Sequence, residues 1–176
     1  FQIDGRIVDV DALVVAAGSE SAKLLKPAGV HLPIYPVKVY SASTAIQEYE
    51  LAPQTAIFDD TYRVSLTRLG KRLRIAGCME LGSASADLHQ KAINTLVKVA
   101  DDWFPNAANY RSANFWCGPT GMLPEGVPLL GATRHANVFV NAGHGAGAWA
   151  MAAGSGKLVA DMVSGRRPEI DQEGLT

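Results

Sequence analysis

A glycine-rich turn near the end of the sequence has the residue types best suited to hold a ligand. Residues 138–156 read VFVNAGHGAGAWAMAAGSG. The apolar start predicts a strand, the three glycines at 143, 145 and 147 predict a turn, and the alanines predict a helix from Ala148 to about Ser164. Such a unit presents free backbone N–H groups and the positive end of a helix dipole at one point. We expect a flat or phosphorylated ligand there.

Small residues continue from this turn into the expected helix. Gly154 and Gly156 each cost about 1 kcal/mol of helix stability relative to alanine, which favours a role in close approach of a cofactor or a second element. A tight contact between helix and sheet, with no ligand, explains the same residues, and both interpretations stay open. His144 inside the turn is either a proton-transferring base or a structural hydrogen-bond donor.

The composition excludes several classes of function. The chain has 176 residues, is 48% hydrophobic and 19% charged, and has a formal net charge of −1. Because no basic run exceeds Arg166-Arg167, we expect no nucleic-acid partner. Glycine or charge interrupts every apolar stretch, so we expect no transmembrane segment. Cys78 and Cys117 form neither a metal pair nor a disulfide framework, and the histidines are widely spaced. We therefore expect no metal site and a reducing compartment.

The middle of the chain has the pattern of an antiparallel sheet. Side-chain character alternates along several runs, as it does in half-exposed strands. The expected strands cover 33–40, 56–58, 62–67 and 72–76. A turn at Leu69-Gly70-Lys71 joins the last two into a hairpin. An amphipathic helix from Ala86 to Trp103 is expected to pack on one face of this sheet.

Both ends of the chain have instead the strand–glycine–helix pattern of a nucleotide-binding α/β domain. Near the start, two strands flank a turn at Asp4-Gly5, and the second leads through Leu13-Val14-Val15 to Gly18 and a helix over 19–25. Near the end, a strand over 113–117 and a loop-rich segment over 118–136 precede the glycine turn. The simplest architecture is one domain shared by both ends, with the middle inserted into it.

Three segments carry a more specific signal. They are DVDALVVAAGSESAKLL, then YPVKVYS with DDTYRVSLTRLGKRLRIAGCMEL, and finally FWCGPTGMLPEGVPLLGATRHANVFVNAGHGAGAWAMAAGSGKLVADMVSGRRPEID. Together they resemble the FAD-dependent D-amino-acid dehydrogenases, within the wider glycine oxidase, sarcosine oxidase and D-amino-acid oxidase group. The resemblance covers nearly the whole chain. It implies a flavoprotein that oxidises the Cα–N bond of an amino acid.

The resemblance implies an α+β or α/β fold, the C-terminal part of an FAD-linked reductase. The expected domains are an FAD-binding domain over 1–29 and 118–176 and an inserted antiparallel-sheet substrate domain over 30–117. The family's N-terminal G-x-G-x-x-G turn has no counterpart here, and the chain opens at Phe1 without an initiator methionine. We therefore interpret the chain as a fragment, in which we expect FAD to be absent or incompletely held.

The resemblance also implies which residues contact the cofactor. The glycine turn matches the loop over the flavin pyrimidine edge, where reduced flavin carries negative charge that backbone N–H groups stabilise. The expected cofactor-binding residues are Ala17, Gly18, Trp116, Gly118, Gly143, His144, Gly145, Ala146, Gly147 and Ala148. Tyr40 and His144 are the expected catalytic residues. For the strand before Gly18, an ordinary core strand with a glycine cap is the open alternative.

The expected carboxylate clamp is where this sequence departs from the family pattern. The arginine of F-W-x-G-x-R-P is replaced by Thr120, and K-G-Y reads Lys38-Val39-Tyr40. Loss of that arginine removes a charged hydrogen bond of about 1.5–3 kcal/mol. Tyr40, Tyr62 and Thr120 are the expected substrate residues. Four strand arginines offer substitutes in principle, although such arginines usually face solvent: Arg63, Arg68, Arg72 and Arg74.

Two functions stay open at this point. The first is FAD-dependent oxidative deamination of an amino acid or amine in amino-acid catabolism, with a quinone or oxygen as electron acceptor. The second is a catalytically silent scaffold or binding subunit, which Thr120 and the missing N-terminal motif favour and the intact glycine turn disfavours. The expected location is cytoplasmic, with peripheral attachment to the inner face of a membrane as an open alternative.

Overall fold

The structure is a computed structural model, and it describes residues 2–172 and Leu175. Within these residues the chain forms two compact units. Unit 1 comprises the segments before Val37 and after Pro119, and unit 2 comprises Val37–Pro119. None of the helices in this described part is long and apolar enough to cross a membrane.

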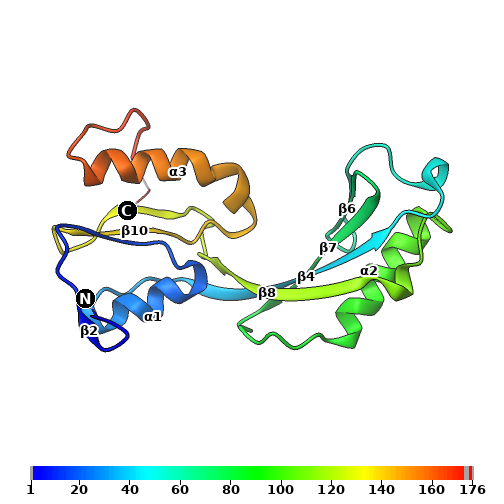
Figure 1. Ribbon diagram of the computed structural model, residues 1–176, viewed down its shortest axis with the longest axis horizontal. Coiled ribbons are helices and arrows are strands. Elements are labelled where there is room, and N and C mark those ends of the chain that lie inside the picture. Colours follow the sequence, from blue (N-terminus) through cyan, green and yellow to red (C-terminus); the bar gives the residue numbers. More distant parts are fainter. Residues whose placement is uncertain (1, 173–174, 176) are drawn as a thin grey trace. The chain divides into compact units, whose positions relative to one another are not determined.

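Unit 1 is built around a three-stranded sheet between two helical layers (Figure 1). Its central strand β10 (Val138–Ala142) lies parallel to β3 (Leu13–Val15) and antiparallel to β9 (Leu129–Ala132). Helix α3 (Ala148–Val163) covers one face, and α1 (Ser21–Leu25) lies on the other. The confirmed glycine turn therefore leaves a central strand and enters a covering helix.

Alternating residues of β10 supply two separate core layers. Phe139 packs with Leu158 and Val159 of α3. Val140 packs with Val15 and Leu25 on the opposite side. This alternation follows from the strand geometry, in which successive side chains point to opposite faces. Both faces of β10 are buried, which places the end of this strand deep inside unit 1.

The remaining elements of unit 1 are short. They are β1 (Gln2–Ile3), β2 (Arg6–Ile7) and the single-turn 3-10 helices η1 (Gly18–Glu20), η2 (Lys26–Ala28) and η5 (Gly145–Gly147). Strands β1 and β2 pair antiparallel around Asp4 and Gly5, whose φ angles are 47° and 79°. The expected turn at Asp4-Gly5 is confirmed.

Unit 2 contains a sheet of five strands in the order β5-β6-β7-β4-β8 within the described residues (Figure 1). The strands are β5 (Ile57–Asp59), β6 (Val64–Leu69), β7 (Arg72–Leu81), β4 (Tyr35–Ala45) and β8 (Asn114–Met122). The other elements are α2 (Gln90–Trp103) and the 3-10 helices η3 (Tyr49–Leu51) and η4 (Tyr110–Ser112). The β6–β7 hairpin turns at Gly70-Lys71, as expected, because Leu69 pairs with Arg72.

The two faces of this sheet differ in character. Residues opposite each other in an antiparallel pair point to the same face. Leu66 and Ala42 flank Ile75, and these three join Leu96 and Val99 of α2 in a buried core. On the other face the side chains are half-buried or exposed. We call this the uncovered face, and it is formed by Ser41, Ser43, Ser65, Thr67, Arg74 and Ala76.

Two expectations about element bounds were wrong. Helix α2 begins at Gln90 instead of residue 86, because 82–89 is an irregular segment whose Ala86 and Asp87 carbonyls accept hydrogen bonds from Cys117 Sγ. The segment 118–136 is not loop throughout, since β8 runs to Met122 and β9 lies within it. Pro119 is tolerated in β8 because this strand lies at the edge of the sheet.

We expect Leu96→Ala to lower the free energy of unfolding by about 3 kcal/mol, because Leu96 is fully buried between α2 and the sheet. Urea denaturation of the chain measures this change. Asn94→Ala, an exposed substitution on the same helix, is the control and should change stability by no more than about 0.5 kcal/mol. Equal effects of the two substitutions would contradict the packing described here.

Candidate functional site

A cleft of about 260 Å³ lies in unit 1 where β10 ends and α3 begins. Six of the residues singled out from the sequence line it: Gly18, Thr120, Gly143, His144, Gly145 and Ala148. Six further lining residues were missed: Ala16, Gly121, Asn141, Ala142, Ala152 and Ser155. Most residues that line the cleft are small, and none of them is Lys, Arg, Asp or Glu.

Two glycines explain why backbone rather than side chains forms these walls. Gly145 has a φ of +55°, which residues with a Cβ rarely adopt, and an added Cβ would lie 3.1 Å from Met122 Cγ. At Gly121 an added Cβ would lie 2.9 Å from Ile34 Cγ2 and 3.0 Å from the Ser19 amide nitrogen. The end of β8 thus approaches the turn after β3 so closely that glycine is required.

Two buried polar atoms beside the turn have no hydrogen-bond partner among the described residues. They are Asn141 Oδ1 and His144 Nε2, and both residues line the cleft. An unsatisfied buried polar group costs about 1–3 kcal/mol. Burial also lowers the pKa of His144, so its imidazole is neutral at neutral pH. A ligand with polar groups along one edge would satisfy both atoms.

The start of α3 adds a fixed positive potential at the same place. Its N-cap residue, Gly147, has no side chain to accept a hydrogen bond from the first turn. The N–H of Ala148, the first residue of α3, donates to the Gly145 carbonyl of the preceding 3-10 turn, so the positive end of the dipole of this 16-residue helix lies at that turn. The Ser155 hydroxyl donates to the Met151 carbonyl at 2.8 Å. The arrangement favours a ligand edge on which negative charge develops.

A family model for FAD-dependent oxidoreductases (DAO) matches residues 2–162. The chain belongs to this family. Among curated relatives, it is 45% identical to a D-amino acid dehydrogenase of Methylobacterium radiotolerans over 98% of this chain and 41% of that protein. It is 41% identical to a D-amino acid dehydrogenase of Bradyrhizobium diazoefficiens over 97% of this chain and 40% of that protein. The chain thus spans about two fifths of the length of these relatives.

Solved structures show the same fold. Glycine oxidase from Geobacillus kaustophilus superposes with a TM-score of 0.84 at 24% identity, covering 94% of this chain and 44% of that one. Iminodiacetate oxidase from a Chelativorans species gives a TM-score of 0.82 at 18% identity, covering 98% of this chain and 47% of that one. The expected α+β architecture of an FAD-linked oxidoreductase is confirmed.

The cleft fits the edge of a flavin. An isoalloxazine edge is planar and lined with carbonyl and ring nitrogen atoms, which suit the positive end of a helix dipole and a neutral imidazole. The small residues on the walls leave room for a flat ring to approach the backbone. No group of three or more His, Cys, Asp or Glu side chains placed to bind a metal occurs in the described part of the chain.

Five of the expected cofactor-binding residues are not part of the lining of this cleft. Ala17, Ala146 and Gly147 do not line the cleft, and the Ala17 amide donates to Ser21 Oγ at 3.0 Å. Trp116 and Gly118 belong to unit 2, where the indole occupies the space of a Gly118 Cβ, with Cζ2 only 2.5 Å from that position. This glycine therefore allows Trp116 to lie flat along β8.

The two expected tyrosines of unit 2 differ in exposure. Tyr62 is 41% exposed, and Lys98 Nζ lies 5.4 Å from its ring centre. Tyr40 is 2% exposed and belongs to the core beneath α2. Its hydroxyl has no hydrogen-bond partner among the described residues, and burial raises the pKa of this group. Within unit 2, Tyr40 is thus enclosed rather than presented to solvent.

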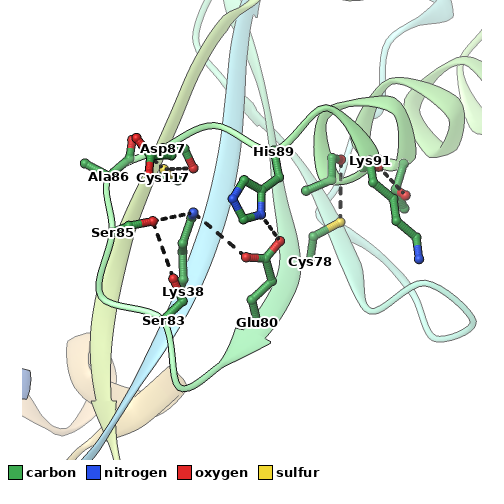
Figure 2. Close-up of polar contacts among 12 residues, drawn as sticks. Lys38, Cys78, Glu80, Ser83, Ser85, Ala86, Asp87, His89, Lys91 and Cys117 are labelled. Carbon is green, nitrogen blue, oxygen red and sulfur yellow. Dashed lines mark hydrogen bonds and ion pairs between the residues drawn. The ribbon is translucent and has the colours of Figure 1, made fainter.

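A charged network of Lys38, Glu80 and His89 lies on the helix-covered face of the sheet (Figure 2), and Lys38 Nζ is 5.3 Å from the ring centre of Tyr40. Lys38 is fully buried, and its Nζ donates to Ser85 Oγ at 3.2 Å and lies 3.8 Å from Glu80 Oε2. Glu80 Oε1 lies 3.0 Å from His89 Nδ1. Burial lowers the pKa of Lys38, but the neighbouring Tyr40, Cys117 and Glu80 outweigh it, and the net shift is upward. Lys38 therefore stays charged and is committed to this network.

We expect the chain to lose stability as the pH falls below about 6.5, in part because of His144. Its folded pKa is depressed, so the unfolded state takes up a proton first, and stability present at pH 7.5 is lost as the pH falls through the folded pKa. Urea denaturation at pH 7.5 and pH 5 measures the loss. His144→Gln should reduce it, whereas His31→Gln, at an exposed position, should not. Identical pH profiles for all three proteins would contradict this assignment.

Proposed function

We propose that this chain is part of an FAD-dependent amino acid oxidoreductase of the D-amino-acid dehydrogenase type. Family membership and the names of the curated relatives support the reaction class. The observation that carries the proposal for this chain is the pair of buried atoms without a hydrogen-bond partner among the described residues, Asn141 Oδ1 and His144 Nε2, beside the start of α3. We assign unit 1 to the FAD-binding domain and unit 2 to the substrate domain.

In such a reaction the bound flavin supplies the acceptor for the hydride that leaves the substrate Cα. The residues of this chain hold the bound ligand and polarise the edge that faces them. The positive end of the α3 dipole stabilises negative charge that develops on the adjacent ligand edge, and it needs no reorganisation to do so. Neutral His144 adds a hydrogen bond without adding a charge, and its tautomer follows from the atom it meets. Asn141 Oδ1 accepts a hydrogen bond from a donor on the same edge.

The proposal gives His144 a binding role in place of a proton-transfer role. A base must be able to take up a proton near the working pH, and burial shifts the pKa of His144 away from protonation. The substrate is an amino acid or a related small amine. The electron acceptor, a quinone or oxygen, and attachment to the inner face of a membrane stay predictions.

Gly145→Val in the full-length protein tests the proposal. Valine would meet Met122 and resist the positive φ, so the turn would close toward the cleft. We expect bound FAD per protein to fall on the order of tenfold or more. Flavin absorbance of the purified protein and the thermal midpoint measure occupancy and folding separately.

Gly126→Val is the matched control. Gly126 also has a positive φ, +75°, but a Cβ added there would contact nothing within 4 Å. It carries the same backbone strain outside the cleft and should leave flavin content unchanged. Full flavin occupancy in the Gly145→Val protein would show that the turn does not contact the flavin. Normal flavin content without flavin reduction by any D-amino acid in the native protein would instead indicate a silent scaffold.

A further inference from the structure

We propose that a cavity in unit 2 binds a free amino acid with a large apolar side chain, through Arg111 and Asp101. The cavity measures about 800 Å³ and lies between α2 and the segment 108–115. Cavities of this size hold small molecules when an apolar lining is combined with a few polar groups. Among the described residues, it shares no lining residue with the cleft of unit 1, and its lining belongs entirely to unit 2. The inference does not depend on the proposed function.

Part of the lining is apolar and fixed in place. Ile93 and Val97 of α2 and Phe115 of β8 line the cavity and are half-buried. Ile93 and Val97 lie on the same side of the helix, because residues four positions apart are neighbours there. Tyr110 also lines the cavity and is buried, and its hydroxyl donates to the Phe104 carbonyl at 2.6 Å. An apolar side chain of a ligand is therefore favourably buried against this part of the lining.

Two opposite charges in the lining have no partner within the chain. Arg111 and Asp101 are both exposed, and neither forms an ion pair or a side-chain hydrogen bond among the described residues. The third charged residue of the lining is Lys98, whose Nζ is committed to Asp102 Oδ2. The cavity therefore offers one guanidinium group and one carboxylate to a ligand.

Both of these charges lie at the same end of the cavity. The hydrogen bond from Tyr110 to Phe104, the residue after α2, places the next residue, Arg111, near the C-terminal end of this helix. Asp101 belongs to the last turn of α2. Burial raises the pKa of Tyr110 to about 12, and the charge of Asp101 is the second cause of this shift. The Asp101 carboxylate is therefore close to the segment that carries Arg111.

The apolar part of the lining extends from this end along the helix. Val97 and Ile93 lie about one and two turns before Asp101. Strand β8 runs beside α2 in the opposite direction, because Cys117 Sγ donates to backbone carbonyls that precede the helix. Phe115, two residues earlier in β8, therefore lies on the way from the charged end to the start of α2.

An α-amino acid has the matching distribution of groups. Its ammonium and carboxylate groups are attached to one carbon, and its side chain extends from the same carbon. The guanidinium group of Arg111 holds the carboxylate through two parallel N–H donors, and Asp101 accepts from the ammonium group. An apolar side chain then lies against Val97, Ile93 and Phe115. A ligand with only one of the two charges would leave either Asp101 or Arg111 unpaired.

Calorimetric titration of the full-length holoenzyme tests this inference with L-leucine, leucinamide, which lacks the carboxylate, and 4-methylpentanoate, which lacks the amine. The L form is used because the proposed reaction acts on D-amino acids. We expect Arg111→Met to weaken L-leucine binding by about five- to tenfold and to change leucinamide binding by less than about twofold. Asp101→Asn should weaken L-leucine binding to a similar extent and change 4-methylpentanoate binding by less than about twofold. Lys71→Met and Glu50→Gln, exposed substitutions in unit 2 outside the cavity, should leave all three affinities unchanged.

Hydrogen exchange of the same protein locates the ligand. L-Leucine should slow exchange of backbone amides over 108–115, and less so in the Arg111→Met protein at the same ligand concentration. Protection elsewhere with 108–115 unchanged, or equal L-leucine affinity of the native protein and both variants, overturns the inference. Tighter binding of L-leucyl-L-leucine, whose amine and carboxylate are on different residues, overturns the assignment to a free amino acid. Failure of D-amino acids to reduce the native flavin would overturn the proposed function and leave this inference standing.

Discussion

The turn after β10 is the constraint on which the ligand-binding part of unit 1 depends. Both faces of β10 are buried, and the chain must pass from this strand into α3 over five residues, 143–147. That geometry needs positive φ at Gly143 and Gly145 and leaves the start of α3 without a side-chain cap. The same backbone path leaves two polar side-chain atoms beside a cleft without a hydrogen-bond partner among the described residues. A structure built for helix–sheet packing alone would have no reason to leave them unsatisfied.

Unit 2 separates two kinds of charge on the two faces of one sheet. Beneath α2, Lys38, Glu80 and His89 satisfy one another and hold the segment before the helix. A buried pair of this kind is costly to break, because the remaining partner would be an uncompensated charge. On the opposite face Arg74 lies beside the hydroxyl groups of Ser43 and Thr67 and has no counterion among the described residues.

Much of the fold was readable from local pattern, and the failures have physical causes. The β6–β7 hairpin and α3 follow from period-two alternation and from the glycine turn. Pro119 and the nearby glycines favoured a loop in the sequence. The structure has a strand there because β8 lies at the edge of the sheet, where proline is tolerated. The start of α2 was misplaced because contacts from Cys117 on β8, distant in sequence, fix the residues before it. Asn141 was missed, although a polar residue at the end of a buried strand just before Gly143 was a usable signal. The neighbours of Arg74 on its face of the sheet follow from the strand register. Alternation in the sequence predicts strands but does not predict their register.

Hydrogen exchange of the full-length protein with and without FAD tests the central claim most directly. If the start of α3 binds the flavin edge, backbone amides over 145–150 should exchange at least about tenfold more slowly when FAD is present. Amides of the β6–β7 hairpin provide an internal reference within the same sample. FAD-dependent protection elsewhere in the protein, with exchange over 145–150 unchanged, would contradict the account.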